Sequence, residues 1–375
     1  MSSERVRVGI IGGGLMGREL AGAVGRWAVL EDHPVRPELV AVCDTNPDAL
    51  EWFERIDSVR LRTADYSELL GDDEIDVLYI AVPHHLHERL YLDTIAAGKD
   101  FLAEKPFGID LEAATRIVEA LAGNPEVFVR CSSEMPFFPG AQFAFEAIRS
   151  GALGEMIEAE NAFLHSSDLD PTKPINWKRE ARYCGQIGVM GDLGMHVAHV
   201  PLRVGWRPRS VFAELQDIVK ERPGPDGELV PCDTIDNASL HCDAGFPLAL
   251  RTYRIAPGNM NTWRLSAVGM DGGVMFSTAE PKTVQRFALR DGRQVWERVE
   301  VGSQSSFPTI TGGIFEFGFA DAILQMWASF LAERAGALGD RFGCATPQEA
   351  LDSHRIFAAA LRSGDTRRAE QLHAG

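Results

Sequence analysis

Three glycines near the start of the chain have the spacing of a phosphate-binding turn. Gly12, Gly14 and Gly17 form the pattern G-x-G-x-x-G after the apolar residues 6–11, and a segment of helical periodicity follows. In such a turn the first glycine permits a tight bend, the second lets the backbone approach a pyrophosphate, and the third lets helix and strand pack closely. The chain has 36 glycines, so the spacing gains its meaning from this strand–turn–helix context.

An acidic residue, Asp44, ends the next apolar segment, residues 39–43. A carboxylate at this place can accept hydrogen bonds from the hydroxyls of an adenosine ribose, and it repels the 2′-phosphate of NADP. It therefore favours NAD. Asp44 lies further from Gly17 than is usual, and a surface loop at residues 31–34 accounts for the excess. A plain structural role is also open, because aspartate commonly begins turns such as residues 44–47.

The segments around these residues alternate between short apolar runs and longer stretches of helical period. Strands are predicted at residues 6–11, 39–43, 77–82, 100–103 and 127–131, with a weaker one near 59–61. Helices are predicted at residues 16–29, 47–56, 86–97 and 111–121. The strands are apolar throughout, which is typical of a sheet covered on both faces. Residues 1–131 are thus expected to form a Rossmann domain with a doubly wound parallel sheet.

From residue 132 to residue 375 the pattern changes. Short loops such as Asp271-Gly272-Gly273 join strand-like segments, which predicts an open, mainly antiparallel sheet in an α+β domain. These segments are residues 157–164, 211–219, 238–242, 248–255, 264–268, 274–277, 285–289 and 295–301. Helices are predicted at residues 140–150, 319–335 and 347–361, the last beginning with the capping sequence Thr346-Pro347-Gln348-Glu349.

The composition excludes several classes of protein. With 54 acidic and 37 basic residues the formal charge is −17, and without a basic stretch such a chain repels nucleic acid. No apolar run approaches the ~18 residues of a membrane helix, so no membrane partner is expected. The six cysteines lack C-x-x-C spacing and the polar start resembles no signal peptide. A cytoplasmic protein with free thiols is the prediction.

An ordered set of motifs resembles one enzyme family. After the glycine turn come Val82-Pro83-His84-His85-Leu86-His87, Ala97-Gly98-Lys99, Glu104-Lys105-Pro106 and Asp192-Leu193-Gly194-Met195-His196. Together they are similar to the glucose-fructose oxidoreductase/inositol dehydrogenase/rhizopine-catabolism (Gfo/Idh/MocA) family. The resemblance implies a C-terminal substrate-binding and oligomerisation domain. It also implies NAD(P)-dependent oxidation or reduction of a sugar, cyclitol or related polyol at a secondary alcohol.

The resemblance also implies which residues form the site. Lys105, Asp192 and His196 correspond to the family's catalytic positions. The expected cofactor contacts are Gly12, Gly14, Leu15, Met16, Gly17, Asp44, Val82, Pro83, His84, His87, Glu104, Lys105, Trp177 and Lys178. Three features depart from the family pattern, namely His84 in place of asparagine, Trp177-Lys178 in place of Trp-Arg, and the interrupted glycine stretch Gly185-Gln186-Ile187-Gly188.

Hydride transfer from an alcohol needs removal of the hydroxyl proton and stabilisation of negative charge on oxygen. We expect Lys105 to polarise that oxygen, with its pKa lowered toward neutrality by burial and by the oxidised nicotinamide. His196 ordinarily titrates near neutral pH, so we expect it to accept the proton. Asp192 lies four residues earlier, on the same face if this stretch is helical, and can orient the imidazole or bind a substrate hydroxyl.

A polar loop after residues 157–164 supplies further candidates. His165, Asp168 and Asn176 are expected to contact the hydroxyls of the substrate together with Lys105, Asp192 and His196, although a plain surface loop is also open. His84, His85, His87 and His199 suggest a metal by number alone, but no convincing carboxylate partner accompanies them. No metal is predicted.

The leading interpretation is an NAD-dependent dehydrogenase acting on a sugar, glycoside or cyclitol. A second is an NAD-dependent glycoside-cleaving enzyme that oxidises the sugar transiently. A third is a non-catalytic cofactor-binding regulator, against which Lys105, Asp192 and His196 argue. The strand-rich C-terminal region has few helices to cover both of its faces, so we expect a homodimer or homotetramer.

Overall fold

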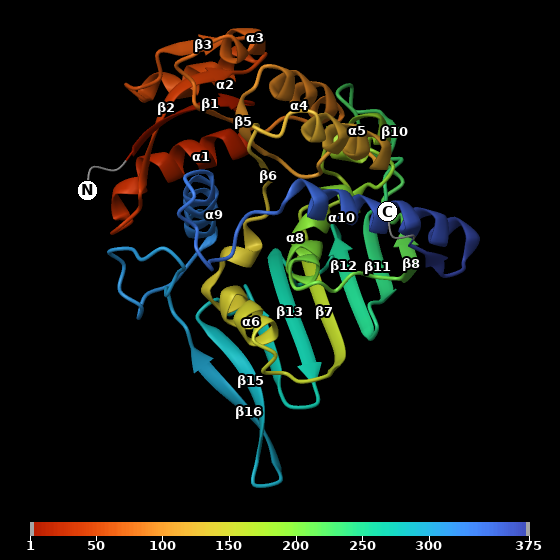
Figure 1. Cartoon of the computed structure of the whole chain (residues 1–375). Helices are drawn as coiled ribbons and strands as arrows, with labels where there is room; N and C mark the ends of the chain where they lie inside the picture. Colours follow the sequence, from red (N-terminus) through yellow and green to blue (C-terminus); the bar gives the residue numbers. More distant parts are fainter. Residues whose placement is uncertain (1–3, 373–375) are drawn as a thin grey trace.

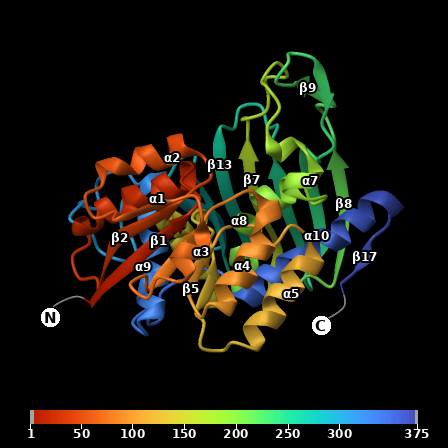
Figure 2. The ribbon, with the colours of Figure 1, turned by 90° about the horizontal axis from the view of Figure 1, so that it is seen from above.

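The computed structural model describes residues 4–372, and these residues form two large β-sheets that lie beside each other (Figure 1 and Figure 2). The first sheet has the order β3-β2-β1-β4-β5-β6, and every neighbouring pair is parallel. Its strands are β1 (Glu4–Ile11), β2 (Val35–Cys43), β3 (Leu61–Thr63), β4 (Val77–Ile80), β5 (Asp100–Ala103) and β6 (Val129–Cys131). They are connected by helices α1 (Leu15–Gly25), α2 (Pro47–Glu51), α3 (Tyr66–Leu70), α4 (His87–Ala96) and α5 (Leu111–Ala122). The doubly wound sheet is confirmed.

The second sheet is mixed, with the order β16-β15-β14-β13-β7-β12-β11-β8-β17. Its strands are β7 (Met156–His165), β8 (Ser210–Gln216), β11 (Asn237–Asp243), β12 (Pro247–Tyr253), β13 (Asn261–Gly269), β14 (Gly273–Ser277), β15 (Thr283–Arg290), β16 (Arg293–Glu300) and β17 (Glu370–Gln371). The pair β7–β12 is parallel and the other neighbouring pairs are antiparallel. The expected open, mainly antiparallel sheet is therefore confirmed.

Helices cover one face of the second sheet (Figure 1). They are α6 (Pro139–Arg149), α8 (Val189–Arg203) and α10 (Pro347–Thr366), which pack on β14, on β7 and β12, and on β8 respectively. The other face carries charged side chains, among them Glu160 between Arg251 and Arg264. Burial alternates along β13, which is the pattern of a strand with only one face in the core.

Helix α8 is the central element of the C-terminal half. Residues 189–202 of it are all buried, because the helix lies between the second sheet and α10. A Cβ atom on Gly194 would lie 2.2 Å from the ring of Phe357 on α10, so glycine permits this close packing. Because residues 189–202 are buried, packing around α8 fixes the side chains of its first two turns, which include Asp192 and His196.

The last two helices of the chain return to the side of the first sheet. Helix α9 (Phe319–Arg334) packs against α1, and α10 packs against α5 (Figure 1). Cys131, at the end of β6, exchanges backbone hydrogen bonds with Ala345. Helices from the C-terminal part of the chain therefore contribute to the packing around the N-terminal sheet.

Several elements differ from the sequence-based expectations. Helix α3, helix α7 (Ala181–Cys184) and the hairpin of β9 (Glu221–Pro223) and β10 (Leu229–Pro231) were not predicted. The α-helices expected at residues 16–29 and 47–56 end at Gly25 and Glu51, and 3-10 turns follow within the predicted ranges. The strand expected at residues 211–219 ends at Gln216, because the Asp236 carboxylate accepts hydrogen bonds from the amides of Ile218 and Val219. Among the helices within residues 4–372, none is long and apolar enough to cross a membrane.

Candidate active site

The glycine turn between β1 and α1 has the geometry that a phosphate site needs. Gly12 has φ +107°, and a Cβ there would lie 2.1 Å from the carbonyl oxygen of Ala81. A Cβ on Gly17 would lie 2.2 Å from the carbonyl oxygen of Gly12, whereas one on Gly14 would meet nothing within 4 Å. Gly12 and Gly17 thus permit close packing, and Gly14 faces open space at the N-terminus of α1. These residues fit a dinucleotide pyrophosphate.

Asp44 lies beside this turn. Its Oδ2 accepts a hydrogen bond from the amide of Gly13 and its Oδ1 accepts one from the amide of Asn46, both at 2.8 Å. The structural interpretation of Asp44 holds, because the carboxylate begins the turn after β2. The ribose-binding interpretation stays a prediction, and it is compatible with the position of Asp44 on the wall of the cavity beside the glycines. Its remaining lone pairs are available to ribose hydroxyls.

A cavity of about 620 Å³ extends from the glycine turn toward β5. Most of the predicted cofactor residues line it, namely Gly12, Gly14, Leu15, Met16, Asp44, Val82, Pro83, His84, Glu104, Lys105, Trp177 and Lys178. Gly17 and His87 do not. His87 is buried, and its ring nitrogens lie 2.7 Å from the Pro106 carbonyl oxygen and 2.8 Å from that of Val82. His87 thus supports the backbone of residues 81–86, the segment between β4 and α4 that lines the cavity and is called the cofactor loop.

The cavity is also lined by residues that were not predicted from the sequence, including Thr45, Ala64, Tyr66 and Arg89. Thr45 follows Asp44 directly, so its position could have suggested it. The other three come from the region of α3 and from α4, where no motif marked them.

His84 lies at the opposite end of the cavity, with its ring edge-on to Trp177 at a centroid distance of 4.7 Å. This contact joins the cofactor loop to residues 166–180, the segment between β7 and α7, which is called the substrate loop.

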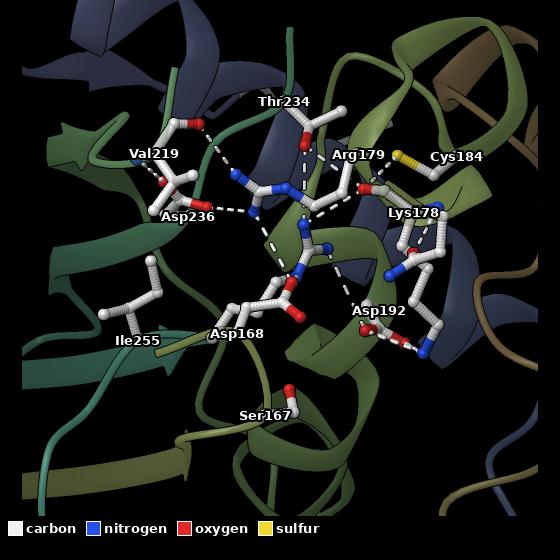
Figure 3. Close-up of polar contacts among 12 residues, drawn as sticks. Ser167, Asp168, Lys178, Arg179, Cys184, Asp192, Val219, Thr234, Asp236 and Ile255 are labelled. Atoms are coloured by element: carbon white, nitrogen blue, oxygen red, sulfur yellow. Dashed lines mark hydrogen bonds and ion pairs between the residues drawn. The ribbon is translucent and has the colours of Figure 1, made fainter. Parts of the chain in front are cut away.

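Lys105 and Lys178 share a single carboxylate at the end of this cavity (Figure 3 shows Lys178 and Asp192). Lys105 Nζ donates hydrogen bonds to the backbone oxygen of Asp192 at 2.7 Å and to Oδ1 at 3.0 Å. Lys178 Nζ donates to Oδ1 at 2.8 Å and to Oδ2 at 3.0 Å. Asp192 lies in the first turn of α8, and the lysines approach it from β5 and from the substrate loop.

The expected role of Asp192 as the residue that orients His196 is wrong. Within residues 4–372 no hydrogen bond joins these two side chains, because the lysines occupy the carboxylate. His196 is buried one turn later in α8, and its Nδ1 lies 3.4 Å from Ser133 Oγ and 3.7 Å from Glu134 Oε2. Ser133 and Glu134 follow β6, at the carboxyl edge of the sheet where such domains bind ligands. That position is the signal that could have identified them.

The pKa of His196 differs from the expectation, and the pKa of Lys105, which was expected to be lowered beside an oxidised nicotinamide, is raised by the surrounding protein groups. Burial lowers the pKa of Lys105, but the carboxylates of Asp192 and Glu104 outweigh it, so the pKa is raised above the ordinary value. Burial, assisted by the charge of Lys105, holds the pKa of His196 well below its ordinary value. At neutral pH the site therefore contains a charged Lys105 and a neutral imidazole at His196.

Two further groups have shifted pKa values. Burial, with a contribution from Glu104, raises the pKa of Glu134 to about 7. Burial lowers the pKa of Lys178 in spite of its contact with Asp192, and the charge of Lys105 adds to that effect. The pKa values of the two lysines that bind Asp192 are thus shifted in opposite directions.

A second cavity, of about 440 Å³, adjoins the first and shares Lys105, Lys178 and Asp192 with it. All the predicted substrate residues line it, namely Lys105, His165, Asp168, Asn176, Asp192 and His196. Some of their polar atoms already have partners. The Asn176 side chain accepts a hydrogen bond from the amide of Lys178, and Asp168 Oδ1 accepts one from Lys173 Nζ at 3.1 Å.

A buried ion network anchors the loop that carries these residues (Figure 3). Arg179 is fully buried, pairs with Asp236, and lies 3.6 Å from Asp168 Oδ2. Its Nη2 donates a hydrogen bond to the carbonyl oxygen of Val219 at 3.0 Å. Thr234 Oγ1 donates to the carbonyl oxygen of Lys178 at 3.1 Å. The loop is thus tied to the segment that connects β8 with β11 in the second sheet.

The histidines do not gather into a metal site. In the described part of the chain, no three His, Cys, Asp or Glu side chains are placed to hold a metal ion together. His85 packs against Tyr183, and His199 packs against Phe342. These contacts give His85 and His199 a role in packing.

Comparisons with known proteins agree with this architecture. Residues 6–130 match the model of the oxidoreductase family with an NAD-binding Rossmann fold, and residues 142–275 match the Gfo/Idh/MocA C-terminal domain. Levoglucosan dehydrogenase of Pseudarthrobacter phenanthrenivorans is 24% identical over 378 residues, covering 96% of this chain and 90% of that protein. Inositol 2-dehydrogenase of Acidothermus cellulolyticus is 31% identical over 186 residues, covering 46% of this chain and 48% of that protein.

Among solved structures, levoglucosan dehydrogenase in complex with NADH and levoglucosan superposes with a TM-score of 0.90. It is 21% identical, and the match covers 99% of this chain and 100% of that one. At this identity the likeness supports the fold. The two family models together span most of the chain, from the glycine turn to the second sheet. The protein is therefore an NAD-binding oxidoreductase of the Gfo/Idh/MocA family.

Proposed function

We propose that the protein oxidises a secondary hydroxyl of a sugar, glycoside or cyclitol with NAD as the hydride acceptor. The observation that carries this proposal is the position of Lys105, which lines both the cofactor cavity and the substrate cavity. An ammonium group there can contact a substrate oxygen beside the nicotinamide. Two relatives named as dehydrogenases of a sugar and of a cyclitol support the substrate class.

The glycine turn and Asp44 would hold the two ends of the cofactor's adenosine diphosphate half. The amides at the start of α1 would bind the pyrophosphate beside Gly14, and Asp44 would accept hydrogen bonds from the ribose. When bound, NAD supplies the carbon that accepts the hydride. We propose a preference for NAD over NADP, because the carboxylate of Asp44 would repel a 2′-phosphate.

Lys105 would stabilise the charge that forms on the substrate oxygen. Its ammonium has three N–H donors, and two of them bind Asp192. The third is free to donate to the substrate. Because the pKa of Lys105 is raised, the group keeps its charge throughout the neutral range. Such a donor is stronger when it is held in a water-poor cavity before the reaction.

His196 would accept the hydroxyl proton. A proton on Nδ1, toward Ser133 and Glu134, leaves the lone pair on Nε2, which is the tautomer that we assign. The imidazolium formed by proton transfer would lie 3.7 Å from Glu134 Oε2. An ionised Glu134 would stabilise that imidazolium, so Glu134 is assigned as a positioning residue.

The charged face of the second sheet is proposed to form a homodimer or homotetramer interface. Glu160 lies 3.1 Å from Arg251 and 3.2 Å from Arg264 on this face. An interdigitating partner sheet could bury the face and retain these pairs.

A panel of sugars and cyclitols, assayed with NAD and NADP by the absorbance of the reduced cofactor, tests the proposal. We expect net accumulation of NADH with at least one neutral or acidic sugar or cyclitol. Net accumulation would also exclude a reaction in which transient oxidation regenerates NAD. If none of these substrates reduces NAD, although the protein binds NADH, the proposal fails.

A further inference from the structure

One wall of the substrate cavity contains a buried guanidinium with unused donors. Arg254, which follows β12, is 2% exposed and lines the cavity. Its Nη1 donates to the carbonyl oxygen of Lys178 at 3.0 Å and lies 3.4 Å from Thr234 Oγ1. Within residues 4–372, its Nε and Nη2 have no hydrogen-bond partner. Buried donors without partners are uncommon, so this edge of the guanidinium calls for a ligand.

The nearest carboxylates do not satisfy that edge. Asp168 Oδ2 lies 3.8 Å from Nε, and Asp192 Oδ2 lies 3.9 Å from Nη2, beyond hydrogen-bond distance in both cases. The lysines already bind both aspartates. The Nε and Nη2 donors form a planar fork, which matches the two oxygens of a carboxylate.

The charges around the cavity leave room for one anion. Five cations are connected through ion pairs, namely Lys105, Lys173, Lys178, Arg179 and Arg254. Four carboxylates face them, namely Asp168, Asp192, Asp236 and, behind Lys105, Glu104. The fifth carboxyl group, Glu134, faces His196 and has a pKa raised to about 7. Glu134 also acts on Lys105 through its charge, so the five cations exceed the ionised carboxylates by one while Glu134 is protonated, although the chain as a whole has a formal charge of −17.

A second residue with an unpartnered atom lines the same cavity. The Nε2 atom of His165, at the end of β7, is buried and has no hydrogen-bond partner in the described residues. Burial lowers the pKa of His165 to about 4, so the ring is neutral and can pair with a hydroxyl. The cavity thus offers a fork for an anion and a neutral group for a sugar hydroxyl.

We propose that the substrate is a sugar acid, and that Arg254 binds its carboxylate through Nε and Nη2. This inference rests on the proposed dehydrogenase function and names the substrate class of the same site. A carboxylate is favoured over a phosphate, because the planar fork matches two carboxylate oxygens, and because Asp168 and Asp192, at 3.8 Å and 3.9 Å from the same edge, would repel a dianion more strongly than a monoanion. Arg254 is therefore a specificity-determining residue.

The test compares each acid with its uncharged amide, which has nearly the same shape. The probes are D-glucuronate and D-glucuronamide, D-galacturonate and D-galacturonamide, and D-gluconate and D-gluconamide, with D-glucose and D-glucose 6-phosphate as further arms. We expect the acid of at least one pair to exceed its amide by roughly tenfold or more in kcat/KM. We expect Arg254→Lys, which keeps the charge and loses the fork, to reduce that ratio mainly through KM. The control Arg207→Lys, at an exposed site outside both cavities, should retain it.

Calorimetric binding to the enzyme–NADH complex makes the result independent of turnover. Tighter binding of an acid than of its amide supports the proposal even if no sugar reduces NAD, in which case the proposed dehydrogenase function fails by itself. Equal use or binding of acids and amides overturns the role of Arg254, and so does a preference for the 6-phosphate. If Arg254→Lys does not fold, as judged by circular dichroism, the acid and amide comparison on the wild type decides.

Discussion

Glu134 is the group whose replacement tests the electrostatics of the site most directly. It is buried beside His196, and its pKa is raised from 4.5 to about 7. A carboxyl group that binds its proton more tightly in the folded state stabilises the fold below its unfolded pKa. That contribution is lost as the pH rises through the folded value. The free energy of unfolding of the wild type should therefore fall between about pH 4.5 and about pH 7 because of this one group.

The size of the effect follows from the shift. Each unit of pKa difference corresponds to about 1.4 kcal/mol, so the change at Glu134 amounts to about 3 kcal/mol at pH 8. Glu134→Gln has no proton to lose and should lack this decrease. Relative to the wild type, the variant should gain about 3 kcal/mol of stability between pH 4.5 and pH 8.

Urea unfolding followed by tryptophan fluorescence, repeated across this pH range, measures the difference between wild type and variant. The exposed Glu126→Gln is the matched control and should follow the wild type. A second readout is single-turnover hydride transfer, whose rate should rise through about pH 7 in the wild type and lose that rise in Glu134→Gln. Parallel stability curves for wild type and Glu134→Gln would refute the raised pKa, and an unchanged rate profile would refute the pairing with His196.

Three other perturbations test the remaining assignments. Lys105→Met should slow hydride transfer by about 100- to 1,000-fold with NADH binding retained, and a near-normal single-turnover rate would contradict its role. Asp44→Ser should reduce the NAD-to-NADP ratio of kcat/KM by about tenfold, and a wild type that already prefers NADP would contradict the assignment. Light scattering at micromolar concentration should give a mass well above the 41.2 kDa of one chain, so a strictly monomeric protein would remove the proposed interface.

The cofactor side was largely predictable because its signals are local. Gly12, Gly14 and Gly17 lie within six residues of one another, and the sterics that require glycine act between neighbouring segments. Asp44 was found for the same reason, since the end of an apolar strand marks the edge of the sheet. Lys105 was predicted from a similar local signal, because it follows the end of the apolar strand β5.

The substrate side was less predictable because its contacts join distant segments. Ser133 and His196 are 63 residues apart, and Arg254 meets the carbonyl oxygen of Lys178 across 76 residues. No spacing rule relates such positions in a single sequence. The two lysines that occupy Asp192 come from a sheet edge and from a loop, so the partner of Asp192 could not be read from its neighbours in α8.

In the proposed reaction, the arrangement around Asp192 would separate the two tasks of alcohol oxidation before the substrate binds. The pKa of Lys105 is raised, so this group stays a donor to oxygen. Burial holds the pKa of His196 low, so its ring stays free to accept a proton. At neutral pH both groups therefore hold the protonation states that the proposed reaction needs at its start. We therefore expect the neutral-range pH dependence to come from Glu134, whose pKa is raised to about 7 and whose Oε2 lies 3.7 Å from His196 Nδ1.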